Sequence, residues 1–205
     1  MEPTFYFDFG SPNAYLAHRV LPGVEARTGV RFRYVPVLLG GLFKLTGNQA
    51  PMLAFAGVPA KLVYQRREMA RFIERHGITR FRMNSHFPVN TLALMRGAVA
   101  AEGEGLLAPY VEAMFRGMWE ESRELDDPAA LTKALAEGGL PAEHLLARAQ
   151  EAEVKAKLAA NTQEAFERGA FGIPSFLVGD ELYFGKDSLT EIEQDVTGCV
   201  AGTGT

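Results

Sequence analysis

The chain has 205 residues, of which 47% are hydrophobic and 22% charged, a composition that indicates a folded globular protein and excludes a disordered or fibrous one. The 21 Lys and Arg residues are balanced by 25 Asp and Glu residues, and the resulting net charge of −4 argues against a nucleic-acid partner. No apolar run is long enough to cross a bilayer and the first residues lack the pattern of a secretory signal, so we expect a cytoplasmic protein without a membrane partner.

The start of the chain predicts a strand, a helix and a second strand. Phenylalanines alternate with other residues over 4–9, which is the period of a strand. Ser11 followed by Pro12 is typical of a helix start, with serine as the N-cap, and the apolar spacing of this helix continues to Gly29. Alternation then resumes over 30–35. Two strands joined by one helix of this length predict a right-handed, parallel β-α-β unit.

The middle of the chain is helical almost throughout. Apolar residues at helical spacing predict helices over 60–76, 91–102 and 107–118, from Pro128 to near Gly138, and from Val154 to Gly169. The second of these is apolar nearly all round, which indicates a buried helix.

The end of the chain predicts a hairpin and a final helix. Residues 175–178 and 181–184 are strand-like, and the Gly-Asp pair at 179–180 forms the two-residue turn between them. Ser188 and Glu191 have the spacing of a capping box at the start of an amphipathic helix.

The resulting order of elements is β-α-β, a long helical stretch, and β-β-α. This order predicts an α/β protein with the thioredoxin fold and a large all-helical insertion. We assign residues 1–38 and 153–205 to the thioredoxin-like domain and residues 39–152 to the helical insertion domain. No His or acidic residues stand at a metal-ligand spacing, so we expect no metal.

Ser11 has the first pattern that indicates chemistry. A hydroxyl at a helix start lies beside unpaired backbone N–H groups and the positive end of the helix dipole, where a thiolate has a lowered pKa. Because the side chain is an alcohol, the thiol has to come from another molecule. The alternative is that Ser11 only caps the helix.

The sequence from Gly172 to Ser175 has the second pattern. Pro174 stands just before a predicted strand, and bonds before proline are the ones that adopt cis. A cis bond would turn the carbonyl and N–H of Ile173 outward to pair with an extended peptide, and glutathione is such a peptide. The sequence leaves the isomer open.

These patterns occur within longer motifs. The motifs are FDFGSPNAYLA at 7–17, PVLLGGLFKLTGN at 36–48, VPAK at 58–61, FRMNSHFPVNTL at 81–92, FGIPSFLV at 171–178 and FGKD at 184–187. In this order they resemble the 2-hydroxychromene-2-carboxylate isomerases and the kappa-class glutathione transferases, which belong to the DsbA-like branch of thioredoxin folds. The resemblance covers nearly the whole chain.

The resemblance implies a site for glutathione and a small substrate. It implies that Ser11 holds the glutathione sulfur as the catalytic residue, and that Ile173 and Pro174 bind the peptide backbone. The γ-glutamyl end is assigned to Phe184, Gly185, Lys186, Asp187 and Ser188, with Asp187 on its ammonium group and the helix start on its carboxylate. Asn48 and Lys61 are assigned to the cleft for glutathione and substrate, with Lys44 nearby.

The activity implied is a cis–trans isomerisation in aromatic-compound degradation. The thiolate adds to a conjugated double bond of the substrate, rotation follows, and expulsion of the thiolate restores the double bond. Asn13 stands where the family commonly has an aromatic residue, so the wall of the cleft that faces the substrate differs here. An excess of Arg over 61–82 would attract a small aromatic carboxylate, although solvated helix faces explain the same charges.

Other functions stay open at this point. A kappa-like glutathione transferase would use the same thiolate on an electrophile that cannot expel it. A non-catalytic thiol- or peptide-binding relative is a further alternative. The resemblance places Ser11 and Ala14 at the positions of the two CxxC cysteines of the disulfide-exchanging relatives, and the absence of those cysteines argues against a disulfide oxidoreductase. The family also suggests a homodimer. His86 is assigned a local structural hydrogen bond, and Cys199, the single cysteine, an isolated thiol.

Overall fold

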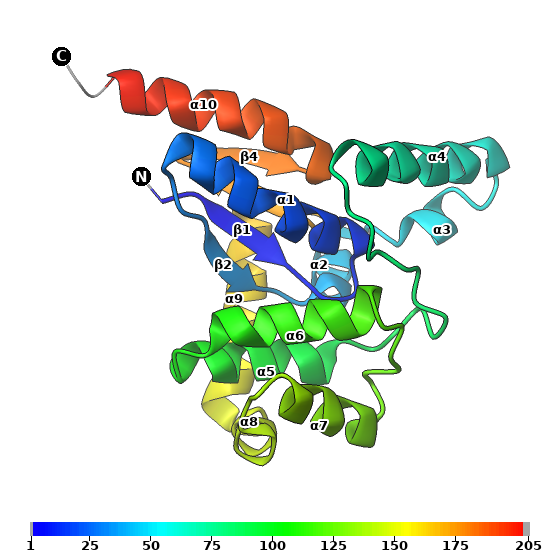
Figure 1. Ribbon diagram of the computed structural model, residues 1–205, viewed down its shortest axis with the longest axis vertical. Helices are drawn as coiled ribbons and strands as arrows, with labels where there is room; N and C mark the ends of the chain where they lie inside the picture. The colour runs from blue at the N-terminus through cyan, green and yellow to red at the C-terminus, as the bar shows by residue number, and fades with distance from the viewer. Residues whose placement is uncertain (1, 203–205) are drawn as a thin grey trace.

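The computed structural model describes residues 2–202, and of residues 198–202 only the backbone. The side chain of Cys199 lies outside this described part, so its assignment stays a prediction. A sheet and its covering helices form one part of the molecule, and helices from the middle of the chain lie below and beside it (Figure 1).

The sheet has four strands in the order β2-β1-β3-β4. β1 (Thr4–Phe7) runs parallel to β2 (Arg33–Pro36) and antiparallel to β3 (Ser175–Val178), which forms a hairpin with β4 (Glu181–Phe184). The predicted β-α-β unit and the hairpin are therefore confirmed. The first strand is shorter than the predicted 4–9, because the chain turns at Asp8, whose own carboxylate accepts the N–H of Gly10.

Helices cover both faces of the sheet. α1 (Pro12–Thr28) and α10 (Leu189–Gly202) pack against each other on one face, and α9 (Ala152–Glu167) contacts β2 from the other (Figure 1). The aromatic side chains of the strands fill the space between, and the Phe5 ring stacks on Phe176 at a centroid distance of 5.1 Å. This core makes the thioredoxin-like part of the chain.

The predicted helical insertion is also present. Its helices are α2 (Leu39–Thr46), α3 (Pro51–Ala54), α4 (Pro59–Arg75), α5 (Leu92–Gly103), α6 (Leu107–Trp119), α7 (Pro128–Glu137) and α8 (Ala142–Arg148). The four longest were predicted from the sequence, and α5 is buried along most of its length as expected. The short helices α2, α3 and α8 were not predicted. The domain boundaries assigned above stay a prediction.

α5 and α6 cross closely because one residue has no side chain. The Tyr110 ring of α6 lies on Gly97 of α5, and its hydroxyl donates to the Leu94 carbonyl at 2.9 Å. A Cβ on Gly97 would lie 2.1 Å from the Tyr110 hydroxyl, so only glycine allows this approach. The contact holds the two central helices of the insertion together.

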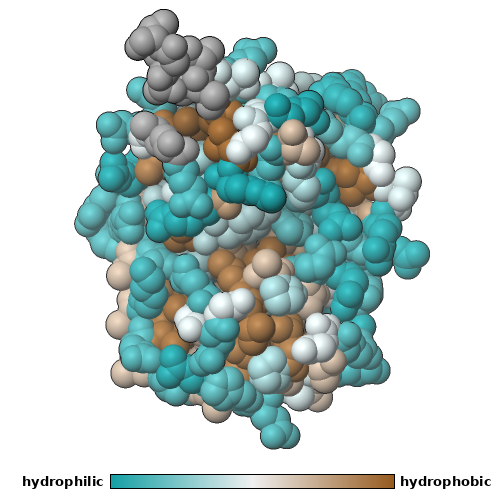
Figure 2. Space-filling view, turned by 60° about the vertical axis from the view of Figure 1, so that its left-hand side comes forward, coloured by the Kyte–Doolittle hydropathy of each residue, from teal (hydrophilic) through white to brown (hydrophobic). Residues whose placement is uncertain are grey.

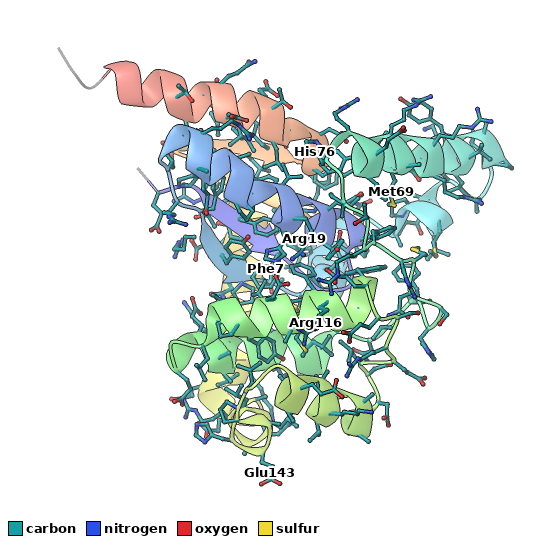
Figure 3. The ribbon with its side chains drawn as sticks, in the orientation of Figure 1. Phe7, Arg19, Met69, His76, Arg116 and Glu143 are labelled. Carbon is teal, nitrogen blue, oxygen red and sulfur yellow. The ribbon has the colours of Figure 1, made fainter. Side chains whose placement is uncertain are left out.

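Charged side chains join α1 to α6. Arg19 extends from α1 toward α6 (Figure 3), and its Nη1 donates to both carboxylate oxygens of Glu112 at 2.9 Å. His18 Nε2 lies 3.2 Å from the same carboxylate. The hydrogen bond from His18, followed by the charge of Arg19, lowers the pKa of Glu112 to about 2. The insertion is thus tied to the thioredoxin-like part by ion pairs as well as by apolar contacts.

α4 is the least buried of the long helices. Only Phe72 of its 17 residues is buried. Most of the exposed large hydrophobic residues of the described chain lie between Leu45 and Tyr64, on α2, α3 and the first turns of α4. Elsewhere, areas of hydrophobic residues lie between hydrophilic ones across the face shown in Figure 2. The part described holds no helix long and apolar enough to span a membrane.

Candidate active site

Ser11 lies at the start of α1 and is 5% exposed. Its backbone is extended and its Oγ accepts the Ala14 N–H at 3.2 Å, so the predicted N-cap is confirmed. Oγ also donates to the carbonyl of Ile173 at 2.9 Å, a residue 162 positions away in the chain. The Asn13 N–H next to it enters none of the hydrogen bonds of the described residues. An unused backbone donor therefore stands beside a hydroxyl at the positive end of a helix dipole.

The Ile173–Pro174 bond is cis, which the sequence had left open. The four carbonyls from Phe171 to Pro174 each accept from a different group: from Asn48 Nδ2 (2.9 Å), Ser175 Oγ (2.8 Å), Ser11 Oγ (2.9 Å) and Gly185 N (2.9 Å), in chain order. We call residues 171–174 the proline loop. It brings together the N-cap of α1, the segment after α2 and the end of β4.

The expectation that both backbone groups of Ile173 turn outward is wrong for the carbonyl and stays a prediction for the N–H. Its carbonyl does not face outward, because it accepts from Ser11 at 2.9 Å. Its N–H, in contrast, takes part in none of the hydrogen bonds found among residues 2–202. The N–H of Ile173 is therefore an unused donor beside the proline loop, whereas its carbonyl already accepts one hydrogen bond, from Ser11.

Phe184 and Gly185, which the resemblance assigns to the γ-glutamyl end, lie against the proline loop. The Phe184 ring packs on Gly172, where a Cβ would come within 2.9 Å of it, and on the Phe171 ring at a centroid distance of 4.5 Å. Both rings are nearly half exposed. Gly185 has a φ of 90°, a conformation that glycine adopts without strain, and this turns its N–H toward the Pro174 carbonyl. The two phenylalanines form an exposed apolar wall beside the loop.

Lys186 has a different environment from the one expected of a glutathione ligand. Its side chain is 2% exposed, and Nζ lies 2.5 Å from Glu68 of α4 and 2.7 Å from Asp187. The ammonium also lies 4.8 Å from the centre of the Phe72 ring. Lys186 therefore joins α4 to the single 3₁₀ turn η1 (Lys186–Ser188), and two of its three N–H donors are used by these carboxylates. The exposed Asp187 carboxylate already pairs with one ammonium group.

Ser188 lies in η1, before α10 begins. Its hydroxyl donates to the Gly185 carbonyl at 2.7 Å, so the turn after β4 is closed by this side chain. The sequence had placed Ser188 as the N-cap of the final helix. α10 begins at Leu189, so Ser188 does stand at the predicted N-cap position, and the 3₁₀ turn that precedes the helix is what local spacing did not reveal.

The remaining predicted residues are distributed around the loop. Asn48 belongs to the site through its bond to the Phe171 carbonyl, and Asn13 follows Ser11 with its side-chain Oδ1 buried and unpartnered among the described residues. Lys61, on the first turn of α4, places Nζ 4.4 Å from the centre of the Phe55 ring. Lys44 is exposed in the last turn of α2. No hydrogen bond or ion pair of residues 2–202 connects either lysine to the proline loop.

Asp8 is a residue of the site that sequence reasoning missed. It is fully buried, and its carboxylate accepts the N–H of Gly10 at 2.8 Å and the N–H of Leu39 at 2.7 Å. Burial raises the pKa of Asp8, and the N–H groups of Leu39 and Gly10 oppose this rise. The signal in the sequence is a charged residue between Phe7 and Phe9, directly after the aromatic run from Phe5 to Phe7.

His86 and the surface charges have local partners. The His86 N–H donates to Asn84 Oδ1 at 2.8 Å and its ring lies 3.5 Å from Glu124, which matches the structural role assigned to it. Arg80, from the basic run after α4, pairs with the buried Glu120 at 2.7 Å. The part of the chain described here contains no cluster of three or more side chains that could hold a metal ion.

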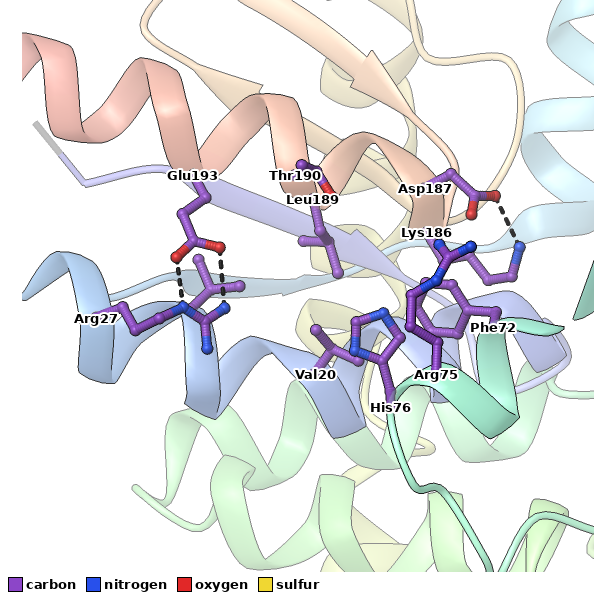
Figure 4. Close-up of a pocket in the computed structure, with 11 residues that line it drawn as sticks. Val20, Arg27, Phe72, Arg75, His76, Lys186, Asp187, Leu189, Thr190 and Glu193 are labelled. Atoms are coloured by element: carbon purple, nitrogen blue, oxygen red, sulfur yellow. Dashed lines mark hydrogen bonds and ion pairs between the residues drawn. The ribbon is translucent and has the colours of Figure 1, made fainter.

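A cavity of about 130 Å³ lies between α1, α4 and α10 (Figure 4). Ion pairs stand at both of its ends, between Arg27 and Glu193 and between Lys186 and Asp187. Neither Ser11 nor the proline loop lines this cavity, whereas Lys186 and Asp187, which the resemblance assigns to the γ-glutamyl end, do.

Three features define a thioredoxin-like domain with a helical insertion. They are the parallel β-α-β unit, the hairpin followed by a helix, and the serine N-cap that is bonded to the cis-proline loop. The chain belongs to the family of DSBA-like thioredoxin domains, whose model matches residues 4–197.

The relatives agree with the resemblance found in the sequence, which is thereby confirmed. The chain is 29% identical to a 2-hydroxychromene-2-carboxylate isomerase of Pseudomonas putida, over 92% of this chain and 91% of that one. It is 26% identical to glutathione S-transferase kappa 1 of Rattus norvegicus, over 90% and 85% of the two chains. A solved structure of a 2-hydroxychromene-2-carboxylate isomerase superposes with a TM-score of 0.85, at 24% identity, over 99% of this chain and 98% of the other.

Proposed function

We propose that this chain is a glutathione-dependent isomerase of the 2-hydroxychromene-2-carboxylate type. The observation that carries the proposal is the hydroxyl of Ser11 at the start of α1, 2.9 Å from the Ile173 carbonyl of the proline loop, with two unused backbone donors beside it. The names of the Pseudomonas putida and Rattus norvegicus relatives support an enzyme. The sequence match to the isomerase extends over nearly the full length of this chain and of the isomerase.

The residues of the site fit an extended thiol peptide. The free N–H of Ile173 is the donor that a peptide backbone requires, and the Asn13 N–H at the helix start is the donor that an anion requires. We assign the γ-glutamyl end to the exposed Asp187 carboxylate and the start of α10, with Phe184 and Gly185 against the peptide. Asn48, Lys61 and Lys44 are assigned to the cleft that takes the substrate. When bound, glutathione supplies a thiolate that adds to a conjugated double bond, allows rotation and leaves unchanged.

Ser11 has to change its hydrogen bond to act on the sulfur. The hydroxyl carries one hydrogen, and this hydrogen lies on the Ile173 carbonyl. Rotation about the Cβ–Oγ bond would turn it toward a sulfur anion, while a lone pair of Oγ continues to accept the Ala14 N–H. Ser11 therefore stabilises negative charge by donation and does not itself attack the substrate. The helix dipole of α1 adds to this stabilisation.

A kappa-like glutathione transferase is the alternative, and the similarity to the rat enzyme favours it. It would use the same serine, helix start and proline loop, because these groups act on the sulfur. The two activities differ in what becomes of glutathione, which an isomerase regenerates and a transferase consumes.

The proposal is tested by assaying the purified protein for glutathione-dependent turnover of a 2-hydroxychromene-2-carboxylate and, separately, of a conjugating electrophile. We expect isomerisation that requires reduced glutathione and leaves its concentration unchanged. Consumption of glutathione without isomerisation would replace the proposal with the transferase. Absence of both reactions, together with absence of calorimetric binding of glutathione, would refute an enzyme of either kind.

We also propose a cytoplasmic homodimer that acts in aromatic-compound degradation. Light scattering over a range of protein concentrations tests the assembly, and a single species at the monomer mass would contradict it.

A further inference from the structure

Asp8 lies where three segments of the chain meet. One carboxylate oxygen accepts the N–H of Gly10, one residue before Ser11, and the other accepts the N–H of Leu39, the first residue of α2. The backbone carbonyl of Asp8 also accepts the Ser11 N–H at 3.1 Å. Both the turn that carries Ser11 and the start of α2 are thus bonded to this one residue.

The turn is packed as well as bonded. A Cβ on Gly10 would lie 3.2 Å from Thr91 Cγ2 and 3.3 Å from Asp8 Oδ1, so the backbone passes closely between Asp8 and the residue that precedes α5. α2 has no side-chain cap of its own: its N-cap is Leu38, and the Asp8 carboxylate supplies the missing acceptor. A carboxylate with N–H donors on both oxygens has a defined orientation.

We propose that Asp8 is a positioning residue, whose carboxylate holds the Gly10–Ser11 turn and the start of α2 in fixed relation and thereby directs the Ser11 hydroxyl at the reacting sulfur. The inference rests on the proposed function and extends it to a residue outside the sulfur contact. It links Ser11 to α2 and, at the far end of α2, to Asn48, which holds the proline loop on its other side. Asp8 makes these connections from a fully buried position.

Two substitutions at Leu39 test whether the Asp8 carboxylate holds the start of α2, without changing Asp8 itself. Leu39→Pro removes the N–H that the carboxylate accepts, and it fits the backbone, because proline is favoured at a first helical position and Leu38 is extended (φ −96°, ψ 110°). Leu39→Ala removes the side chain but keeps the N–H, so it is the matched control. Asp8→Asn is the direct variant, in which one oxygen is replaced by an amide that cannot accept an N–H.

Measuring both kcat and ligand binding distinguishes a positioning role of Asp8 from a general loss of structure. We expect Leu39→Pro and Asp8→Asn to lower kcat by about tenfold or more, since a small displacement of a reacting group is costly. Binding of S-methylglutathione, which depends on the proline loop, should change by less than about threefold in a calorimetric titration. Leu39→Ala should retain the wild-type kcat. Folded Leu39→Pro and Asp8→Asn proteins with wild-type kcat would overturn the inference, as would equal losses of kcat in the proline and alanine variants.

Amide hydrogen exchange decides the matter independently of activity. We expect exchange at residues 10–15 and 39–42 to be faster in Asp8→Asn than in the wild-type protein, and unchanged at α7. If the wild-type protein neither binds glutathione nor turns over substrate, the proposed function fails. Unchanged exchange in Asp8→Asn at both segments would still show that Asp8 does not hold them and would refute the positioning role.

Discussion

Replacing Ser11 with alanine removes two hydrogen bonds at once. The Ala14 N–H loses its cap, and the carbonyl of Ile173, a residue only 6% exposed, loses its donor. The volume lost is that of one hydroxyl, so the packing of α1 against the sheet is retained. Ser11→Ala therefore separates the chemistry of the hydroxyl from the fold around it.

The expected magnitudes follow from these two bonds. Loss of a serine N-cap costs about 1 kcal/mol of stability, and a buried carbonyl without a donor costs about 1–3 kcal/mol. The sum, about 2–4 kcal/mol, is smaller than the stability of an ordinary domain, so the variant should stay folded. Loss of one donor to a developing anion lowers turnover by about 10²–10³-fold.

The assay compares urea unfolding and glutathione-dependent isomerisation in wild type, Ser11→Ala and the control Asp127→Ala. Asp127 caps α7 through a bond of 2.8 Å to the Ala130 N–H, outside the site, so its removal should cost about 1 kcal/mol and leave turnover unchanged. Wild-type turnover in a folded Ser11→Ala protein would refute the role of the hydroxyl. A similar loss of turnover in Asp127→Ala would show that the effect is not specific to the site.

Three further predictions concern the fold around the site. Glu112 has a pKa of about 2 in the folded protein against an ordinary value of 4.5, so it contributes stability above pH 4.5 that is lost as the pH falls toward 2. In urea unfolding over this range, we expect the difference in the free energy of unfolding between wild type and Glu112→Gln to decrease toward zero. A constant difference would contradict the argument. Lys186→Met keeps the packing but leaves two partly exposed carboxylates unpaired, so we expect a loss of about 1–2 kcal/mol in urea unfolding, and no loss would mean that the ion pairs contribute nothing. Gly97→Ala should cost more than about 2 kcal/mol in thermal unfolding because the new methyl overlaps Tyr110, whereas Gly103→Ala in the same helix meets nothing within 4 Å; equal stability of the two variants would show that α5 and α6 separate at little cost.

Much of the fold was predictable because its signals are local. Ser11 and Asp127 cap α1 and α7, Gly29 ends α1 with a φ of 72°, and the Gly-Asp turn joins β3 to β4, all as the sequence indicates. Each of these signals acts within a few residues of the element that it starts or ends. The motifs along the chain, taken in order, likewise sufficed to indicate the DsbA-like family.

The short helix α2 was not predictable in the same way. It contains two adjacent glycines, which lower helix propensity, and it has no capping side chain of its own. Its first N–H is accepted by Asp8, which lies 31 positions earlier. Only the tertiary structure brings this acceptor to the helix start.

For the site as well, some features were predictable from the sequence and others depend on the tertiary structure. The residue types at Ser11, Ile173 and Pro174 already indicate a helix start that favours an anion and a loop that receives a peptide. The folded chain decides that the Ser11 hydroxyl donates to Ile173 and that Lys186 is buried against Glu68, although both had been read as free to meet a ligand. These partners are more than a hundred positions apart, and the geometry of such pairs depends on how whole elements pack, which local spacing does not encode.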